Sequence, residues 1–314
     1  MESLVGSVGG LPAERVLQNF KRSVVKLDQP THPITFNRFK KKMKEISRIY
    51  KNASSKLERS PVLYFVTDSG DDEIEEDAAD VGGPQREVFA IVMETLLSGN
   101  DPQSFEGDDG HKFPVHSQQF VLRGWFSLAG QAMAHVIAHT DFDMVGLAKP
   151  VATYLETGCT ETACATVTMD DIPDLEIKEM LENLMNVDGK EVVVNDALST
   201  LMSQCGVSAA LVTQNNAAEV AYECMIYQVV HKRLAELEKL REGLGVLGLV
   251  KLIESHPRVR SEIFKTIAEA AVSFDVLKHR VQMDATDGYD ATRQQTFNIF
   301  LNHLTDTCER ESGM

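Results

Sequence analysis

The chain has 314 residues, enough for one large domain or two smaller ones, and a formal net charge of −16. Its 43% hydrophobic and 25% charged content is typical of an ordinary soluble globular protein with ample material for a core. The charge is uneven: residues 1–60 carry 13 Lys and Arg against 5 Asp and Glu, whereas the remainder carries 18 against 42. This acidic remainder is a poor candidate for binding nucleic acid or anionic membranes, although the basic segment could bind either or dock on the remainder.

The cysteine pattern and the N-terminus indicate a compartment with reduced thiols. The five cysteines are scattered and include no Cys-x-x-Cys pair, so no zinc site is predicted. The N-terminus lacks the pattern of a signal peptide, and the longest apolar stretch, residues 120–138, contains Arg123, Gln131 and His135. We therefore expect a cytoplasmic or nuclear protein that does not span a membrane. The cysteines are Cys159, Cys164, Cys205, Cys224 and Cys308.

The first 60 residues contain a loose extension followed by a basic amphipathic pattern. Residues 1–30 are punctuated by Gly, Ser and Pro and are expected to form an extension. After them, one helical face is apolar, made of Phe36, Phe39, Met43, Ile46 and Tyr50. Basic side chains occupy much of the rest, namely Lys40, Lys41, Lys42, Lys44 and Arg48. The pattern favours the solvated face of a helix over a nucleic-acid or phosphate site, because charge runs are usually solvated.

The next stretch combines a strand, an acidic run and a helix start. Residues 61–66 are rich in Val, Tyr and Phe, which predicts a strand over Val62–Phe65. Eight acidic residues between Asp68 and Asp80 repel one another, so residues 71–77 are expected to form an exposed loop. Gly82-Gly83 predicts a turn with positive φ, which a β-branched residue would resist. Pro84 suits the first turn of a helix, predicted over Pro84–Leu97.

The middle of the chain predicts a polar loop over residues 100–113 and one long apolar helix over Ser117–His139. His135 and His139 have the spacing of paired metal ligands, but Val136 stands where a metalloprotease needs Glu. We interpret both histidines as packed or helix-terminal groups, and we expect neither a metal site nor a cofactor.

The last third is expected to be mostly helical. Residues 170–175 lead into a short helix ending near Asn186, an Asp-Gly turn and strand-like valines follow over residues 187–194, and residues 199–211 show no clear pattern. A long helix is predicted over Thr213–Gly243, and further helices over Ser261–Val272 and Thr296–Cys308. The glycines at and after the end of the Thr213–Gly243 helix, Gly243, Gly245 and Gly248, follow a helix rather than a strand and so do not form a dinucleotide-binding fingerprint. The predicted fold class is α+β, mainly α-helical.

The order of these segments is similar to that of a known domain. A strand, an acidic loop and the pattern Asp-x-Gly-Gly-x-x-Arg-Glu-x-Phe resemble the early part of the HECT ubiquitin-ligase domain. The matching residues are Asp80, Gly82, Gly83, Arg86, Glu87 and Phe89. Later segments follow in family order. Residues 125–139, with Trp125, Phe126, Ala129 and Gly130, resemble the family's central helix, and residues 169–184 resemble its Asp-rich helix entry. Residues 212–240, with Asn216 and Tyr222, resemble its long helix, residues 252–263 resemble the turn toward its closing helices, and Gly288-Tyr289 resembles its hinge.

The resemblance spans residues 34–308 and implies a division of the chain. Residues 1–30 would be an N-terminal extension, residues 31–280 a divergent HECT N-terminal lobe, and residues 281–314 the hinge and first helix of a truncated catalytic lobe. The family transfers ubiquitin through a cysteine thioester. Its catalytic cysteine lies far into the second lobe, so the resemblance implies a ubiquitin-transferase fragment or homologue that is not catalytic by itself. Cys308 follows Thr307 as in the family, but only six residues come after it, and no catalytic residue is assigned.

The resemblance also implies partners and leaves alternatives open. The family binds a ubiquitin-conjugating enzyme and ubiquitin through the segment corresponding to residues 187–212, which is short here and lacks the family's aromatic residues. A protein substrate would be expected as well. One alternative is a non-catalytic scaffold derived from this lobe. Another is a nucleic-acid-associated protein that uses the basic N-terminal helix, although the net charge makes nucleic acid an unfavoured partner.

Overall fold

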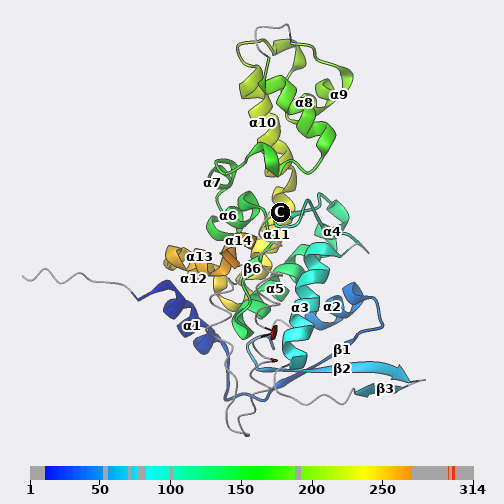
Figure 1. Cartoon of the computed structure of the whole chain (residues 1–314), viewed down its shortest axis with the longest axis vertical. Helices are drawn as coiled ribbons and strands as arrows, with labels where there is room; N and C mark the ends of the chain where they lie inside the picture. The colour runs from blue at the N-terminus through cyan, green and yellow to red at the C-terminus, as the bar shows by residue number, and fades with distance from the viewer. Residues whose placement is uncertain are drawn as a thin grey trace, which may run out of the picture. The chain divides into compact units, whose positions relative to one another are not determined.

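The computed structural model describes residues 11–51, 56–69, 72–75, 83–99, 102–187 and 192–270, together with 296, 299 and 300. It divides the chain into two compact units, residues 1–266 and 267–314. The division comes earlier than the boundary after residue 280 expected from the sequence. Figure 1 shows a mainly helical protein with a few short strands, which confirms the α+β class. In the second unit the described helix is α14 (Ile267–Ala270).

A three-stranded sheet lies at one end of the first unit (Figure 1). Its strands are β1 (His32–Asn37), β2 (Pro61–Ser69) and β3 (Asp72–Glu75), in that order. β1 and β2 are parallel and are joined through helix α2 (Lys42–Tyr50), whereas β3 runs antiparallel to β2. Alternate residues of β1 face the core, and Phe36 packs edge-on against Phe65 of β2, with ring centroids 6.2 Å apart. The strand predicted over Val62–Phe65 is thereby confirmed.

The helix predicted from Phe36 begins only at Lys42. Asn37 ends strand β1, and its Oδ1 accepts hydrogen bonds from the backbone N–H groups of Phe39 and Lys40, at 2.9 and 3.2 Å. This side-chain turn competes with a helix and sends Phe39 outward, where it is 79% exposed. The expected apolar face is correct from Met43 onward, because Met43, Ile46 and Tyr50 are buried.

The expectation that the acidic run forms a loop is wrong for its described residues 72–75. Residues 72–75 form β3, paired with residues 66–69 of β2, whereas residues 70, 71 and 76–82 lie outside the described residues. Helix α3 (Gly83–Ser98) confirms the helix predicted from Pro84. The turn predicted at Gly83 is wrong: Gly83 is the first residue of α3, has no positive φ, and a Cβ there would meet nothing within 4 Å. Asp80 and Gly82 of the family-like pattern lie outside the described residues.

The long helix predicted over Ser117–His139 is two helices. The Ser117 hydroxyl caps α4 (Gln118–Leu122), and Gly124, with φ +68°, turns the chain into α5 (Trp125–His139). α5 is buried along almost its whole length and packs against α11 (Leu234–Leu244) in the middle of the unit (Figure 1). Gly130 of α5 and Gly243 of α11 allow their backbones to approach closely, since a Cβ on Gly130 would lie 2.1 Å from the Leu240 carbonyl oxygen.

Two further predicted helices are also interrupted. The helix expected over Thr213–Gly243 is α10 (Ala217–Val229), a 3-10 turn η3 (His231–Arg233) and then α11. The helix expected over Ser261–Val272 is α13 (Arg260–Ile263), strand β7 (Phe264–Lys265) and then α14. β7 pairs in parallel with β6 (Met144–Val145), a long-range contact that local periodicity cannot show. Of the helix predicted over Thr296–Cys308, the structure describes only residues 296, 299 and 300.

The remaining elements surround the α5–α11 pair. The loop expected over residues 100–113 contains a short hairpin of β4 (Phe105–Glu106) and β5 (Phe113–Pro114). The helices are α6 (Lys149–Thr157), α7 (Thr160–Cys164), α8 (Leu175–Met185), α9 (Asp196–Gln204) and α12 (Leu249–Ser255). The short 3-10 turns are η1 (Met169–Asp171), η2 (Ala209–Leu211), η4 (Gly245–Leu247) and η5 (Pro257–Val259).

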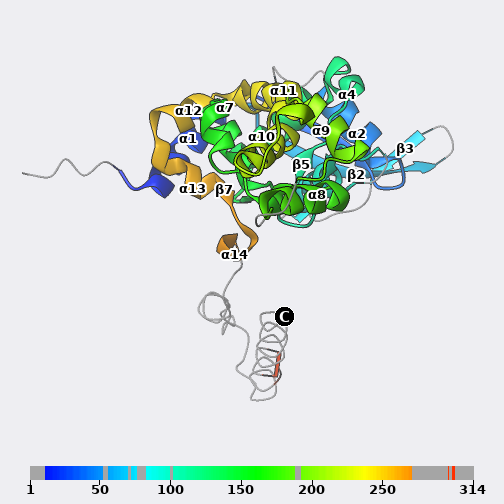
Figure 2. The same cartoon turned by 90° about the horizontal axis from the view of Figure 1, so that it is seen from above.

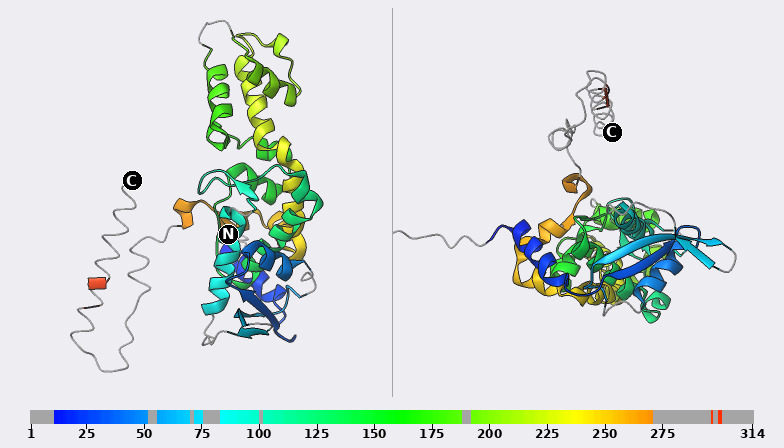
Figure 3. Two further views of the ribbon diagram at one scale, coloured as in Figure 1. Left: turned by 90° about the vertical axis from the view of Figure 1, so that its right-hand side faces the viewer. Right: turned by 90° about the horizontal axis from the view of Figure 1, so that it is seen from below.

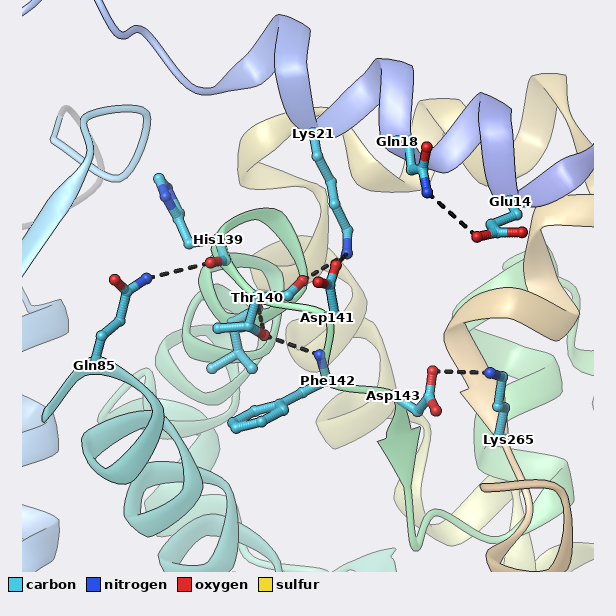
Figure 4. A network of polar contacts seen from close by, with 11 residues as sticks. Glu14, Gln18, Lys21, Gln85, His139, Thr140, Asp141, Phe142, Asp143 and Lys265 are labelled. Carbon is cyan, nitrogen blue, oxygen red and sulfur yellow. Dashed lines mark hydrogen bonds and ion pairs between the residues drawn. The ribbon is translucent and has the colours of Figure 1, made fainter. Parts of the chain in front are cut away.

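The segment expected to be an N-terminal extension contains helix α1 (Ala13–Val24), which is docked on the first unit. Figure 4 shows Lys21 reaching the end of α5: its Nζ donates to the Thr140 carbonyl oxygen at 2.5 Å and lies 3.1 Å from the Asp141 carboxylate. In the same network Lys265 of β7 pairs with Asp143 at 3.0 Å. A buried Leu17 adds an apolar contact, so α1 is part of the packed unit.

Candidate protein-interaction surface

The described residues 175–187 and 192–229, called the arm below, form the end of the first unit opposite the sheet (Figures 1 and 3). The arm consists of α8, α9, η2 and α10, and α10 packs against both α8 and α9. Its core is apolar: Leu181, Leu184, Leu198, Leu201, Met202, Ala217, Val220, Ala221, Cys224 and Met225 are buried. The arm therefore has a small hydrophobic core and is not an irregular loop.

Side-chain caps explain why the arm's helices start where they do. The Asp174 carboxylate accepts from the N–H groups of Glu176 and Ile177, and the Asn195 amide oxygen accepts from Leu198 N–H. Asn216 closes the turn before α10, because its Oδ1 accepts from Thr213 N–H at 2.7 Å and its Nδ2 donates to the Leu211 carbonyl. The prediction that the first of these helices ends near Asn186 is confirmed. The segment over residues 199–211, which showed no clear pattern, contains most of α9.

Large apolar side chains are exposed on the arm more densely than elsewhere. Of the ten such side chains described in the first unit, five belong to the arm: Leu175, Met185, Val193, Leu211 and Tyr222. Val193, Leu175 and Leu211 are 83%, 78% and 72% exposed. Single exposed apolar residues are ordinary, but their concentration in one small subdomain is typical of a surface that binds another protein. Local sequence patterns do not show this concentration, because the exposure of Leu175, Met185 and Tyr222 depends on which faces of α8 and α10 pack together, and Val193 and Leu211 lie outside α8, α9 and α10.

The charged groups around these side chains are acidic. The arm's described acidic residues are all exposed, whereas Lys178 is its one described basic residue. The acidic residues are Glu176, Glu179, Glu182, Asp196, Glu219 and Glu223. An apolar surface with an acidic surround favours a partner whose own apolar patch is bordered by Lys and Arg.

A buried arginine fixes the junction between the arm and the rest of the unit. Arg233, 3% exposed, lies between α10 and α11; its Nε donates to the Pro114 carbonyl at 3.0 Å and its Nη2 pairs with Glu106. Glu236, one turn later, accepts from Ser117 N–H at 2.8 Å. These contacts bind the base of the arm to the β4–β5 hairpin and to α4. They also explain why the long predicted helix breaks at residues 231–233, since an unbroken helix would not place Arg233 in this pocket of acceptors.

The described cysteines show no activated nucleophile. Burial raises the pKa of Cys164, whose Sγ lies 3.9 Å from His231 Nε2. Cys205 and Cys224 hydrogen-bond to each other, which raises the pKa of Cys205 and lowers that of the buried Cys224. Cys308 lies outside the described residues. Cys159 Sγ donates to the Glu161 carboxylate at 3.1 Å, and Cys224 is buried, so neither thiol has the exposed, electropositive setting of a reactive cysteine.

His135 and His139 are packed side chains with hydrogen-bond partners inside the protein. Tyr50 Oη lies 3.1 Å from His135 Nδ1, and His139 Nε2 lies 2.7 Å from the Leu57 carbonyl oxygen. Burial is the largest cause lowering the pKa of both imidazoles. Among the described residues there is no group of three or more His, Cys, Asp or Glu side chains that could hold a metal ion.

The described residues of the family-like pattern have structural surroundings. Glu87 pairs with Arg38 at 3.1 Å, and the Arg38 guanidinium lies 3.6 Å from the centroid of the Phe65 ring. Phe89 is buried, and its ring packs edge-on against His135. Arg86 is exposed. The pattern thus joins α3 to the sheet and to α5 and does not form a reactive site.

Comparison of the sequence with models of known protein families and with curated proteins gave no match. Within the described ranges, each helix is too short or too polar to cross a lipid bilayer.

Proposed function

We propose that the chain is a HECT-like lobe that docks a ubiquitin-conjugating enzyme on its arm, in the cytoplasm or nucleus, without itself accepting ubiquitin. The observation that carries the proposal is the concentration of exposed apolar side chains on the arm. This segment includes the interval in which the family, by resemblance, has its docking subdomain. The arm forms a packed helical subdomain there despite the shortness of residues 187–212.

The chemistry of the arm suits such a partner. Leu175, Val193 and Leu211 are apolar anchors that would lose their contact with water on binding. The surrounding carboxylates would speed encounter with a basic partner and orient it. Because the acidic groups are exposed, most of the affinity must come from the apolar anchors, since exposed ion pairs contribute about 0–1 kcal/mol each.

The binding experiment uses the full chain and a panel of purified ubiquitin-conjugating enzymes, with affinity measured by calorimetry or biolayer interferometry. We expect saturable binding to at least one member, and Leu211→Asp should weaken it tenfold or more, equivalent to about 1.4 kcal/mol. Leu27→Asp is the matched control, because Leu27 is also a highly exposed leucine, at 81% against 72% for Leu211, but lies outside the arm. Equal loss in both variants, or no binding by any panel member, would contradict docking on the arm.

The second part of the proposal, the absence of ubiquitin transfer by this chain, is tested separately. The chain is incubated with ubiquitin-activating enzyme, charged conjugating enzymes and ubiquitin, and the products are separated without reductant. We expect no thioester on the chain. The pKa values of Cys164 and Cys205 are raised, and Cys224, whose pKa is lowered, is buried and cannot reach a charged conjugating enzyme. A reductant-sensitive adduct that disappears in Cys308→Ala would overturn this expectation and identify Cys308 as the nucleophile.

A further inference from the structure

A cavity of about 760 Å³ lies outside the arm, between α2 and the corner where α4 turns into α5. Figure 2 shows α2 and α4 near each other on this side of the unit. The apolar lining of the cavity includes Met43, Tyr50, Phe120, Trp125 and Leu128. A volume of this size is in the range of small-molecule pockets, about 300–1,000 Å³. The largest lining side chains are aromatic, which suits a flat apolar ligand body.

The charged groups that line this cavity are all basic. Lys44 and Lys51 come from α2 and its C-terminal end, and Arg123 comes from the α4–α5 corner. No described carboxylate lines the cavity, although the chain as a whole has an excess of acidic residues. Three cations among the lining residues, without a described carboxylate beside them, create a positive potential in the cavity, which attracts an anion.

Two buried polar atoms of cavity-lining residues lack a partner. Trp125, 7% exposed, has its Nε1 donor buried without a hydrogen bond, and the Oε1 acceptor of Gln131 is likewise buried and unpaired among the described residues. Buried polar atoms are normally paired, and an unpaired one costs about 1–3 kcal/mol. Both residues belong to α5, one at its start and one in its second turn, and both line the same cavity. Both atoms have almost no exposed surface, so a bound ligand would pair with them only after the Trp125 or Gln131 side chain turns toward the cavity.

We propose that this cavity is a binding site for a small organic anion: a flat apolar body with one carboxylate, sulfonate or phosphate group. The body packs on Tyr50, Phe120 and Trp125, while the anionic group faces Lys44 and Arg123. Selectivity for the charged form follows, because the rim has cations and no described carboxylate. The site is independent of the arm, so it stands or falls separately from ubiquitin-conjugating enzyme docking.

Trp125 is the single tryptophan of the chain and so reports on its own cavity. The test titrates the full chain with 8-anilinonaphthalene-1-sulfonate, an aromatic anion, and follows energy transfer from Trp125. We expect saturable quenching of Trp125 emission and binding at least tenfold weaker for the uncharged analogue N-phenyl-1-naphthylamine. Quenching that does not saturate, or equal affinity for the neutral analogue, would overturn the proposal.

Variants separate this site from general dye adsorption. Lys44→Gln combined with Arg123→Gln should weaken dye binding tenfold or more. The control, Lys42→Gln with Arg258→Gln, removes the same charge at exposed positions that do not line the cavity and should leave affinity within twofold. Ser47→Phe adds a ring at a cavity-lining position and should also weaken binding, with an unchanged far-ultraviolet circular dichroism spectrum showing that the variant is folded. Equal affinity in the cavity and control pairs, with both folded, would refute the site.

Discussion

Replacing Gly130 with alanine tests the crossing of α5 and α11, on which the first unit is built. The new Cβ would lie 2.1 Å from the Leu240 carbonyl oxygen and 2.6 Å from the Leu244 nitrogen, where ordinary contact begins at 3.4 Å. The obstructing atoms are backbone and not a flexible side chain, so the two helices themselves must move apart. Because most of α5 is buried, this movement disturbs the packing of its neighbours as well.

Two opposing terms set the magnitude. Alanine is favoured over glycine within a helix by about 1 kcal/mol. Overpacking of a well-packed core costs typically about 1–3 kcal/mol, and a clash with backbone belongs at the upper end of that range. We therefore expect Gly130→Ala to lower the free energy of unfolding by about 2 kcal/mol.

The assay is equilibrium urea unfolding followed by circular dichroism and by Trp125 emission. Gly83→Ala is the matched control, because Gly83 is also helical and a Cβ there meets nothing within 4 Å, so its stability should be unchanged or slightly higher. The double variant Gly130→Ala/Gly243→Ala should lose less free energy of unfolding than the two single variants lose in sum, since the same separation of α5 and α11 relieves both clashes. A Gly130→Ala protein as stable as the wild type would refute the close crossing.

Two further predictions concern buried titratable groups. Glu106→Ala should lower the free energy of unfolding by about 3 kcal/mol, because it leaves the buried Arg233 charge without its carboxylate. Arg233→Met should lower it less, since Glu106 is 32% exposed and can be solvated. Urea unfolding that gives the reverse order of stability for the two variants would contradict this. Because the pKa values of His135 and His139 are lowered in the folded protein, the unfolded chain binds protons at these positions before the folded chain does as the pH falls. Their contribution to stability should be complete above about pH 6.5 and decline toward about pH 5.5, and a urea midpoint equal at both values would exclude it.

Elements whose signals are local were predictable from the sequence. The strand over residues 62–65 and helix α3 follow from β-branched and aromatic runs, from Pro84 and from the apolar spacing after it. The end of α8 near Asn186 and the inward face of α2 from Met43 onward are likewise local patterns. In each case the residues that decide the element lie within one or two turns of one another, so periodicity and capping are sufficient.

Only the tertiary structure decided where long patterns break and which surface is exposed. The apolar spacing continues through Gly124 and through residues 230–233, yet the chain turns at both places, because Ser117 is held by Glu236 and Arg233 by Glu106 and Pro114. These partners are more than 100 residues apart in sequence, and no window of local pattern contains them. The same holds for Leu175 and Tyr222, whose exposure depends on how α8 and α10 pack, and for the cavity at Trp125, which is lined by side chains from α2 and α5. The sequence by itself determined the helical class and the hydrophobic faces, whereas long-range packing determined the helix breaks, the arm and the cavity.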